Sequence, residues 1–315
     1  MRTTGKLDRL YRNYKSLEHI NRRVRKDLEG FILETEEDYK NDIDYTAEYI
    51  ASKINDARVV MLSGPSGSGK TTSAEKLSDA LEKIGIKAHM LSMDNYFLSR
   101  CDVIEGVDFE SPLRLDIPLL QNHIEALSTN ATIEVPEYDF LTGLRKKETK
   151  ALRINTDEVV IFEGIHALNC MFIEKVCHRP IGIYVSPRMR VTNGGSIIIQ
   201  PESIRFLRRS LRDKRTRGAS FERTLGLWES VIKGELEHIM PNKWRADIVI
   251  DTTMEYELGV YAPLIDEEFS NLLVSGEYMG YRHNMENLTC EIKRFEPISR
   301  NNVPEESLLR EFIGK

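Results

Sequence analysis

The chain has 315 residues, 41% of them hydrophobic, and a formal net charge of −6 at pH 7. This is enough for one large α/β domain with appendages or for two small domains. The acidic balance gives no reason to expect nucleic acid, and no apolar run approaches the roughly 20 residues that span a bilayer. The charged N-terminus has no signal-peptide pattern and the four cysteines form no C-x-x-C pair, so we expect a cytoplasmic protein.

The first part of the chain has hydrophobic spacing typical of helices, with a basic half ("NRRVRKDL") followed by an acidic half ("ETEEDYKNDIDYTAEY"). An organelle transit peptide would be poor in acidic residues, whereas Asp8, Glu18 and Asp27 interrupt the basic half. We interpret residues 1–54 as a helical N-terminal extension. Residues 55–253 are predicted to form the core with a lid, and residues 254–315 a C-terminal helical segment.

The apolar run "VVML" leads into "SGPSGSGKTTSA", which matches G-x-x-x-x-G-K-[ST] through Gly64, Gly69, Lys70 and Thr71. Glycines let successive backbone N–H groups point at one anion, Lys70 can reach the β- and γ-phosphates, and the Thr71 hydroxyl can ligate Mg²⁺. A strand before and an amphipathic helix after the loop complete its expected context. We predict a P-loop for ATP and Mg²⁺ built from Gly64, Pro65, Ser66, Gly67, Ser68, Gly69, Lys70, Thr71 and Thr72.

From Arg58 to about Thr253 the pattern alternates between strands and helices, which predicts an α/β fold with a mostly parallel sheet flanked by helices. The strand candidates are residues 59–62, 87–94, 158–164, 181–186 and 246–252. Helices are expected near residues 70–84, 116–127, 168–176, 202–216 and 220–238. The alternating runs "TIEVPEYDF" and "ETKALRIN" predict an inserted β-hairpin that turns around Thr142–Gly143.

Two acids directly follow apolar runs, Asp94 in "HMLSMDNYF" and Glu163 in "VVIFEG". Ligands of such sheets bind beyond the carboxyl ends of the strands. A transferred phosphoryl group needs a base for the acceptor hydroxyl, and a nucleotide-bound Mg²⁺ needs carboxylate near its water shell. We assign Asp94 as the candidate base and Glu163 to the metal shell, although either alone could be an ordinary strand-end or capping acid.

The segment "SIRFLRRSLRDKRTRG" places Arg205, Arg208, Arg209, Arg212 and Arg215 on one side of a helix. A solvated basic face is one interpretation. In phosphoryl transfer, however, arginines that close over the phosphates stabilise the spreading charge and exclude water. Because Gly218 offers a hinge, we predict a lid that acts through Arg212 and Arg217, with Arg209 behind them.

The ordered set "GPSGSGKTT", "LSMDNYF", "YDFLTGLRK", "VVIFEGIHAL" and "LRRSLRDKRTRG" resembles the uridine kinase and phosphoribulokinase family of P-loop kinases over roughly residues 58–253. The tail "VPEESLLREFIGK" is similar to the end of a longer bacterial branch. The resemblance implies ATP-dependent phosphorylation of a nucleoside 5′-hydroxyl, with Asp94 as the base. It places Tyr138 and Asp139, in "YDF", at the wall of the acceptor pocket, where Tyr138 could stack on a base or simply pack the hairpin. Asp94, Tyr96, Tyr138 and Arg209 are the candidates for binding the acceptor.

Two positions depart from the resemblance. Gly143 stands where pyrimidine nucleoside kinases of the family usually carry a histidine, and Glu110 replaces an acid that usually contacts the ribose. The insertion "VTNGGSIIIQPES" is expected to lengthen the approach to the lid. Because Gly143 offers no side chain for a hydrogen bond, we predict weak selection between bases.

The sequence therefore predicts a kinase of a small-molecule acceptor, most plausibly uridine or cytidine, with no membrane or nucleic-acid partner. Two alternatives stay open: a kinase of a sugar or polyol on the same frame, and a nucleotide-dependent switch. A switch needs no acceptor base, so Asp94 counts against it. The oligomeric state, including a homo-oligomer, is left open.

Overall fold

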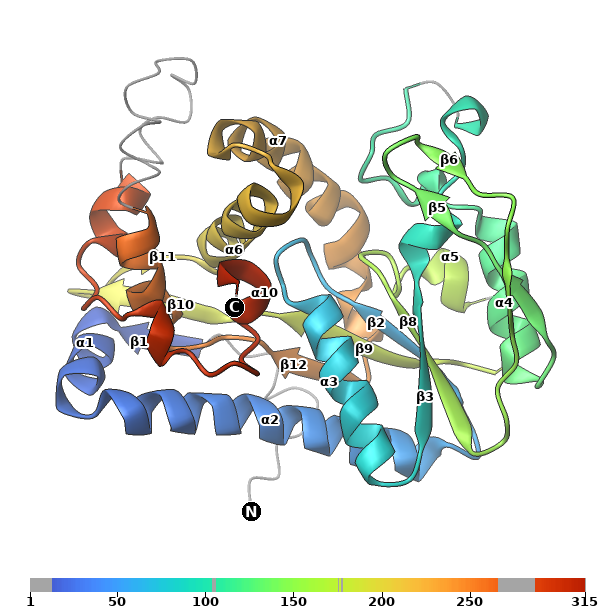
Figure 1. The fold of residues 1–315 in the computed structure, drawn as a ribbon, viewed down its shortest axis with the longest axis horizontal. Coiled ribbons are helices and arrows are strands. Elements are labelled where there is room, and N and C mark those ends of the chain that lie inside the picture. The colour runs from blue at the N-terminus through green and yellow to red at the C-terminus, as the bar shows by residue number, and fades with distance from the viewer. Residues whose placement is uncertain (1–12, 104–105, 175, 177, 266–286, 315) are drawn as a thin grey trace.

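Five parallel strands form the central sheet of the computed structural model, which describes residues 13–103, 106–174, 176, 178–265 and 287–314 (Figure 1). Their order across the sheet is β12-β9-β2-β8-β3. The strands are β2 (Val59–Ser63), β3 (Lys87–Ser92), β8 (Glu158–Glu163), β9 (Ile181–Ser186) and β12 (Ile248–Asp251). All five lie where the sequence predicted strands, so the parallel α/β sheet is confirmed.

The sheet separates two hydrophobic clusters because successive side chains of a strand point to opposite faces. Val60 of β2 belongs to one cluster and its neighbour Met61 to the other. The first cluster is covered by α2 (Leu28–Lys53) and α3 (Lys70–Lys83), and the second by α4 (Ile117–Ser128) and α5 (Cys170–Ile173). Burial on both faces explains why the central strands are continuous apolar runs.

The N-terminal extension is not purely helical. Strand β1 (Asn13–Ser16) precedes α1 (Leu17–Lys26) and pairs in parallel with β10 (Met189–Asn193). Strand β10 pairs in turn with β11 (Ser196–Ile199) across a turn in which Gly194 and Gly195 both have positive φ. The insertion that the sequence placed on the approach to the lid is therefore mainly a β-hairpin, and its pairing partner lies about 175 residues earlier in the chain (Figure 1).

The predicted inserted hairpin is confirmed, with two short ladders. Strand β4 (Ile133–Val135) pairs with β7 (Lys150–Leu152), and β5 (Tyr138–Asp139) pairs with β6 (Leu144–Arg145). Gly143 lies in the connecting turn with φ +71°, a backbone conformation that residues other than glycine rarely adopt.

Two helices that carry the predicted lid follow β11. Helix α6 (Pro201–Arg217) ends at Gly218, which has a φ of 61°, and α7 (Phe221–Gly234) follows. The single helix predicted to residue 238 instead becomes a π-helix over Glu235–Ile239 and then a 3₁₀ helix over Met240–Arg245. Pro241 accounts for the break after Ile239, because proline has no N–H to continue the hydrogen bonding of the preceding helix.

The terminal segments share the larger hydrophobic cluster with the core. This cluster contains Ile43 of α2, Leu77 of α3 and Phe312 of α10 (Arg310–Ile313). The division into three parts stays a prediction, and the part of the C-terminal prediction over residues 266–286 lies outside the described residues. Within the described chain, no helix combines the length and apolar character needed to cross a bilayer.

Candidate nucleotide-binding and catalytic site

The predicted P-loop joins β2 to α3 and leaves no room for side chains at its glycines. Gly67 has φ +75°, and a Cβ there would lie 2.5 Å from the carbonyl oxygen of Arg205. Gly69 has φ +84°, and a Cβ there would lie 2.7 Å from Leu308 Cδ1. The loop is therefore fixed between α6 and the C-terminal segment. Its backbone N–H groups and the first turn of α3 form the cradle that phosphates require, so the residues present fit ATP.

Lys70 and Thr71 lie at the start of α3 with different environments. The ammonium group of Lys70 donates a hydrogen bond to the carbonyl oxygen of Pro65 at 3.3 Å. Burial lowers the pKa of Lys70, and the carboxylates of Glu163 and Asp94 act in the opposite direction. Thr71 is exposed, and no hydrogen bond of its hydroxyl is found within the described chain. The Lys70 ammonium group and the Thr71 hydroxyl thus lie beside the cradle, where they would contact phosphate and Mg²⁺.

Asp94 and Glu163 come together because their strands are neighbours. Strands β3 and β8 pair in parallel with Ser92 opposite Glu163, and a 3₁₀ helix over Met93–Tyr96 follows β3 directly. The Ser92 hydroxyl acts to lower the pKa of Glu163, against the effect of burial. In the described residues no group of three or more His, Cys, Asp or Glu side chains forms a ready metal site. A Mg²⁺ ion here would depend on Thr71, the phosphates and a carboxylate at its water shell, as Mg²⁺ commonly does.

The acids of the site have pKa values displaced by their surroundings. Surrounding protein raises the pKa of Asp94, although Lys70 and Arg217 oppose the shift. Asp94 is nevertheless exposed to solvent. Burial likewise raises the pKa of Glu163 and of Glu110, and Glu110 also senses Lys70 and Asp94. Displaced carboxyl pKa values beside a lysine in a cleft are typical of active sites.

The arginines of α6 divide into two groups that the helical pattern did not separate. Arg208 is fully buried and pairs with Glu257 at 2.8 Å, and Arg205 is 2% exposed and pairs with Glu235 at 2.6 Å. These two arginines hold the helix in place and do not form part of an open basic face.

The three arginines predicted for the lid lie on the P-loop side of α6 and share one acid, Asp213. Asp213 Oδ1 lies 3.1 Å from Arg212 Nη2 and 3.4 Å from Arg217 Nη1, while Asp213 Oδ2 lies 3.3 Å from Arg209 Nε. Arg209 also donates to the Ser66 hydroxyl of the P-loop at 3.0 Å. Asp213, which the sequence interpretation missed, thus gathers three cations beside the phosphate cradle.

The C-terminal segment adds a carboxylate that sequence reasoning did not assign. Thr72 Oγ1 donates to Glu311 Oε2 at 2.6 Å, and Arg212 Nη1 lies 3.6 Å from Glu311 Oε1. Arg215 Nη2 donates to the backbone carbonyl oxygen of Glu311 at 2.7 Å. The first turn of α3 is therefore tied to a segment 239 residues away.

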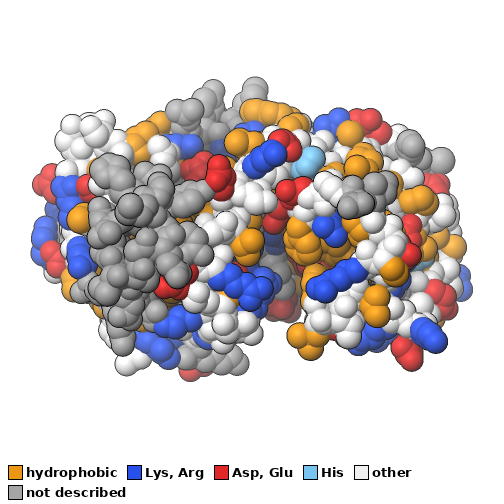
Figure 2. All heavy atoms as spheres, turned by 90° about the horizontal axis from the view of Figure 1, so that it is seen from above, with side chains coloured by type: hydrophobic (Ala, Val, Ile, Leu, Met, Phe, Trp, Pro, Cys, Tyr) orange, Lys and Arg blue, Asp and Glu red, His pale blue; other side chains and the backbone are white. Residues whose placement is uncertain are grey.

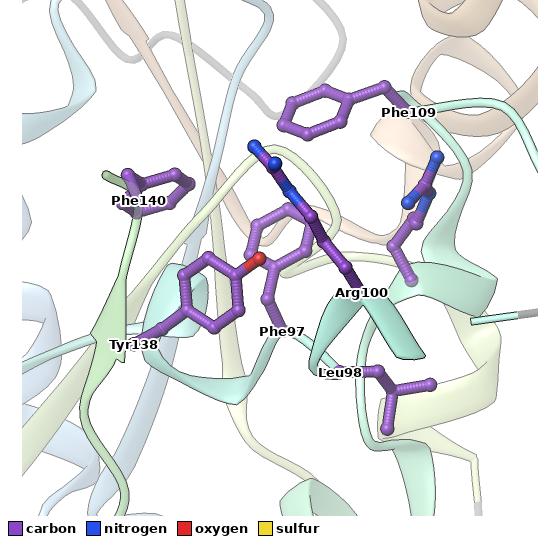
Figure 3. Close-up of a pocket in the computed structure, with 7 residues that line it drawn as sticks. Phe97, Leu98, Arg100, Phe109, Tyr138 and Phe140 are labelled. Carbon is purple, nitrogen blue, oxygen red and sulfur yellow. The ribbon is translucent and has the colours of Figure 1, made fainter. Parts of the chain in front are cut away.

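An aromatic pocket of about 430 Å³ lies beyond the 3₁₀ helix that carries Asp94 (Figure 3). Phe97 is its centre, with ring centroids 5.7 Å from Phe109, 5.5 Å from Tyr138 and 5.8 Å from Phe140. The pocket is lined by Phe97, Leu98, Arg100, Phe109, Arg114, Tyr138 and Phe140. Phe109 and Phe140 are more than half exposed, and exposed aromatic rings around a hollow mark a binding site.

Tyr138 lines this pocket as predicted, but Tyr96 does not. Tyr96 is 0% exposed and its hydroxyl pairs with His123 Nδ1 at 2.9 Å. The 3₁₀ helix turns Tyr96 inward against Phe162 and sends Phe97, the next residue, outward to the pocket. Tyr96 therefore offers no exposed surface to a substrate in this structure, and Phe97 lines the pocket instead.

Seen from above, the molecule has a deep groove between two halves (Figure 2). Lysine, arginine and acidic side chains line its walls, and hydrophobic side chains gather on one side (Figure 2). This distribution fits a charged site for phosphates beside an apolar site for an acceptor.

The profile of the phosphoribulokinase/uridine kinase family matches residues 59–258. A uridine kinase of Borrelia garinii is 30% identical over 198 residues, covering 62% of this chain and 86% of that protein. A uridine kinase of Listeria monocytogenes is 34% identical over 207 residues, covering 64% of this chain and 90% of that protein. The solved structure of a possible uridine kinase from Bacillus stearothermophilus aligns with a TM-score of 0.46 at 19% identity, over 67% of this chain and 98% of that one. The chain belongs to the phosphoribulokinase/uridine kinase family.

Proposed function

We propose that the protein transfers the γ-phosphoryl group of ATP to the 5′-hydroxyl of a nucleoside, uridine or cytidine, in the cytoplasm. The observation that carries the proposal is the continuity of three sites. The P-loop cation Lys70 acts on the Asp94 carboxylate, and Phe97, three residues after Asp94, opens the aromatic pocket. The proposed phosphate site, the catalytic base Asp94 and the pocket for the ring of the acceptor are thus adjacent.

Each residue has one role in this proposal. Asp94 takes the proton of the acceptor hydroxyl, and its raised pKa suits that task because a stronger base accepts the proton more readily. Lys70 and the arginines that Asp213 gathers stabilise the negative charge on the transferred group. Thr71 and Glu163 hold Mg²⁺ or its waters, and Mg²⁺ supplies neutralisation of the phosphate charge.

The aromatic pocket favours a nucleoside over a sugar or polyol. Phe97 and the three rings around it provide flat faces for a base, and stacking tolerates any base. A polyol would instead need several hydrogen-bonding partners, and the polar side chains among the described lining residues are two arginines and a tyrosine. The relatives named uridine kinase support the same choice.

The test is ADP release from Mg-ATP with a panel of uridine, cytidine, adenosine, myo-inositol and simple sugars under identical conditions. We expect kcat/KM for uridine and cytidine to exceed that for every sugar and polyol. If a sugar or polyol were the best acceptor, the proposal would be replaced by the metabolite-kinase alternative. ADP release that no acceptor stimulates would favour a switch.

A further inference from the structure

The polar side chains that line the acceptor pocket are not equivalent. Arg114 donates from Nη2 to the carbonyl oxygen of Val107 at 2.9 Å and from Nε to that of Asp108 at 3.3 Å. Its guanidinium also lies over the Phe109 ring, 5.6 Å from the centroid. Arg114 is therefore occupied with holding its own loop.

Arg100 is the uncommitted cation of the pocket. Within the described part of the chain its guanidinium makes no hydrogen bond or ion pair, and only its backbone N–H is used, donating to the carbonyl oxygen of Gly143 at 3.0 Å. In Figure 3 the Arg100 side chain extends between Tyr138 and Phe109 in front of the Phe97 ring. A guanidinium group, which carries only donors, thus lies at a space that is walled mainly by aromatic rings.

Gly143 makes this placement of Arg100 possible. A Cβ at position 143 would lie 2.2 Å from Arg100 Nε and 2.6 Å from its Cδ, and the backbone φ of +71° disfavours any side chain there. A histidine at position 143 would therefore displace Arg100 and would not simply be added to the pocket. Arg100, which comes from a separate loop, thus occupies the space that a side chain at position 143 would need.

A guanidinium can only donate, so the ring that enters this pocket must offer an acceptor atom at its outer edge. In a pyrimidine nucleoside the ring position farthest from the ribose is C4, directly across the ring from the nitrogen that carries the sugar. Asp94 must meet the 5′-hydroxyl, so the C4 edge points away from Asp94 and into the pocket. Uracil carries a carbonyl oxygen there, whereas cytosine carries an amino group, which is itself a donor.

We propose that Arg100 is a specificity-determining residue, which donates to the C4 carbonyl oxygen of the acceptor ring and so favours uridine over cytidine. The inference rests on the proposed nucleoside kinase function. It also revises the expectation that an empty position 143 leaves selection between bases weak. A hydrogen bond from a charged donor in a partly exposed pocket corresponds to a preference of about 10- to 100-fold.

The experiment compares uridine, cytidine and 4-deoxyuridine, which lacks the C4 oxygen and with it the N3 proton, and it uses wild-type protein, Arg100→Met and Arg100→Lys. Arg100→Met keeps an unbranched apolar stem and removes every donor. We measure kcat/KM by ADP release and the Kd of each nucleoside by calorimetry. In the wild type we expect uridine to exceed 4-deoxyuridine by about 10- to 100-fold, and in Arg100→Met we expect this ratio to fall to within about 3-fold. Arg100→Lys keeps a donor and should retain part of the preference.

Arg114→Met is the matched control, because the Arg114 guanidinium holds a loop. This substitution should change kcat/KM for all three nucleosides by the same factor. The inference is overturned if wild-type protein accepts nucleosides but does not distinguish uridine from 4-deoxyuridine. It is also overturned if Arg100→Met lowers kcat/KM for uridine and for 4-deoxyuridine by the same factor. If the wild type accepts no nucleoside at all, the proposed function itself fails and the inference fails with it, which is a visibly different result.

Discussion

Substitution of Arg208 by methionine should destabilise the fold, because Arg208 neutralises a carboxylate that has no access to water. Arg208 and Glu257 are both 0% exposed, and their two N–O contacts measure 2.8 and 2.9 Å. Arg208 Nη2 also donates to the carbonyl oxygen of Thr252 at 2.7 Å. Removing one partner of such a pair costs about 3–5 kcal/mol, since the other charge stays buried and unpaired.

The loss of the Arg208 side chain should also disturb the P-loop. Thr252 Oγ1 donates to the carbonyl oxygen of Ser68 at 2.7 Å, and Arg208 holds Thr252 in place. A typical domain has an unfolding free energy of about 5–15 kcal/mol, so a loss of this size is a large fraction of the total. Urea denaturation measures this loss of stability: the midpoint of unfolding should fall, while the dependence of the unfolding free energy on urea concentration stays unchanged.

Arg212→Ala is the comparison that separates the two groups of arginines on α6. Arg212 is partly exposed and pairs with Asp213 at 3.1 Å, a contact worth at most about 1 kcal/mol. We expect its substitution to leave stability nearly unchanged and to lower kcat by up to about 10³-fold. An Arg208→Met variant within about 1 kcal/mol of the wild type would refute the argument from burial. Replacing Arg208 and Glu257 together by apolar residues should recover much of the loss.

Two further predictions concern acids at the site. Asp94→Asn should preserve ATP affinity and lower kcat by about 10²-fold or more, because the amide cannot accept the proton. In the wild type kcat should rise with pH through the raised pKa of Asp94, since only the ionised carboxylate is a base, and a pH–rate profile of both proteins should show this limb in the wild type alone. Glu311→Gln keeps an acceptor for the Thr72 hydroxyl and removes a negative charge near the phosphates, so calorimetry should show ATP bound about 3- to 10-fold more tightly. Weaker ATP binding by Glu311→Gln would mean that Glu311 orders the site and does not repel the nucleotide.

The sheet and the approach of Asp94 to Glu163 were predictable from the sequence, because both follow from local patterns and one rule of topology. Short continuous apolar runs identify buried strands, and the carboxyl ends of parallel strands lie at the same edge of the sheet. The pairing of Ser92 with Glu163 then brings the two acids together. The P-loop was equally readable, since its glycines and Lys70 are adjacent in the chain.

The features that the sequence did not show depend on partners far away in the chain. Five arginines on one helix look alike until Glu235 and Glu257 select Arg205 and Arg208 for burial. Tyr96 follows Asp94 in the chain, but His123 draws it into the core. No local pattern could show these choices.

Other contacts of the site were missed for the same reason. The contact of Thr72 with Glu311 joins the P-loop to the end of the described chain. The space that Gly143 leaves for Arg100 joins two separate loops. These contacts follow from tertiary structure alone, and they lie in the proposed nucleotide and acceptor sites.

The central claim is transfer of a phosphoryl group to a nucleoside 5′-hydroxyl, and the identity of the product tests it most directly. Uridine and Mg-ATP are incubated with the protein, and the product is examined by ³¹P nuclear magnetic resonance. We expect a monoester whose phosphorus couples to the two 5′ protons, formed in equal amount with ADP and absent with 5′-deoxyuridine. Inorganic phosphate alone, or an ester at the 2′- or 3′-oxygen, would contradict the account.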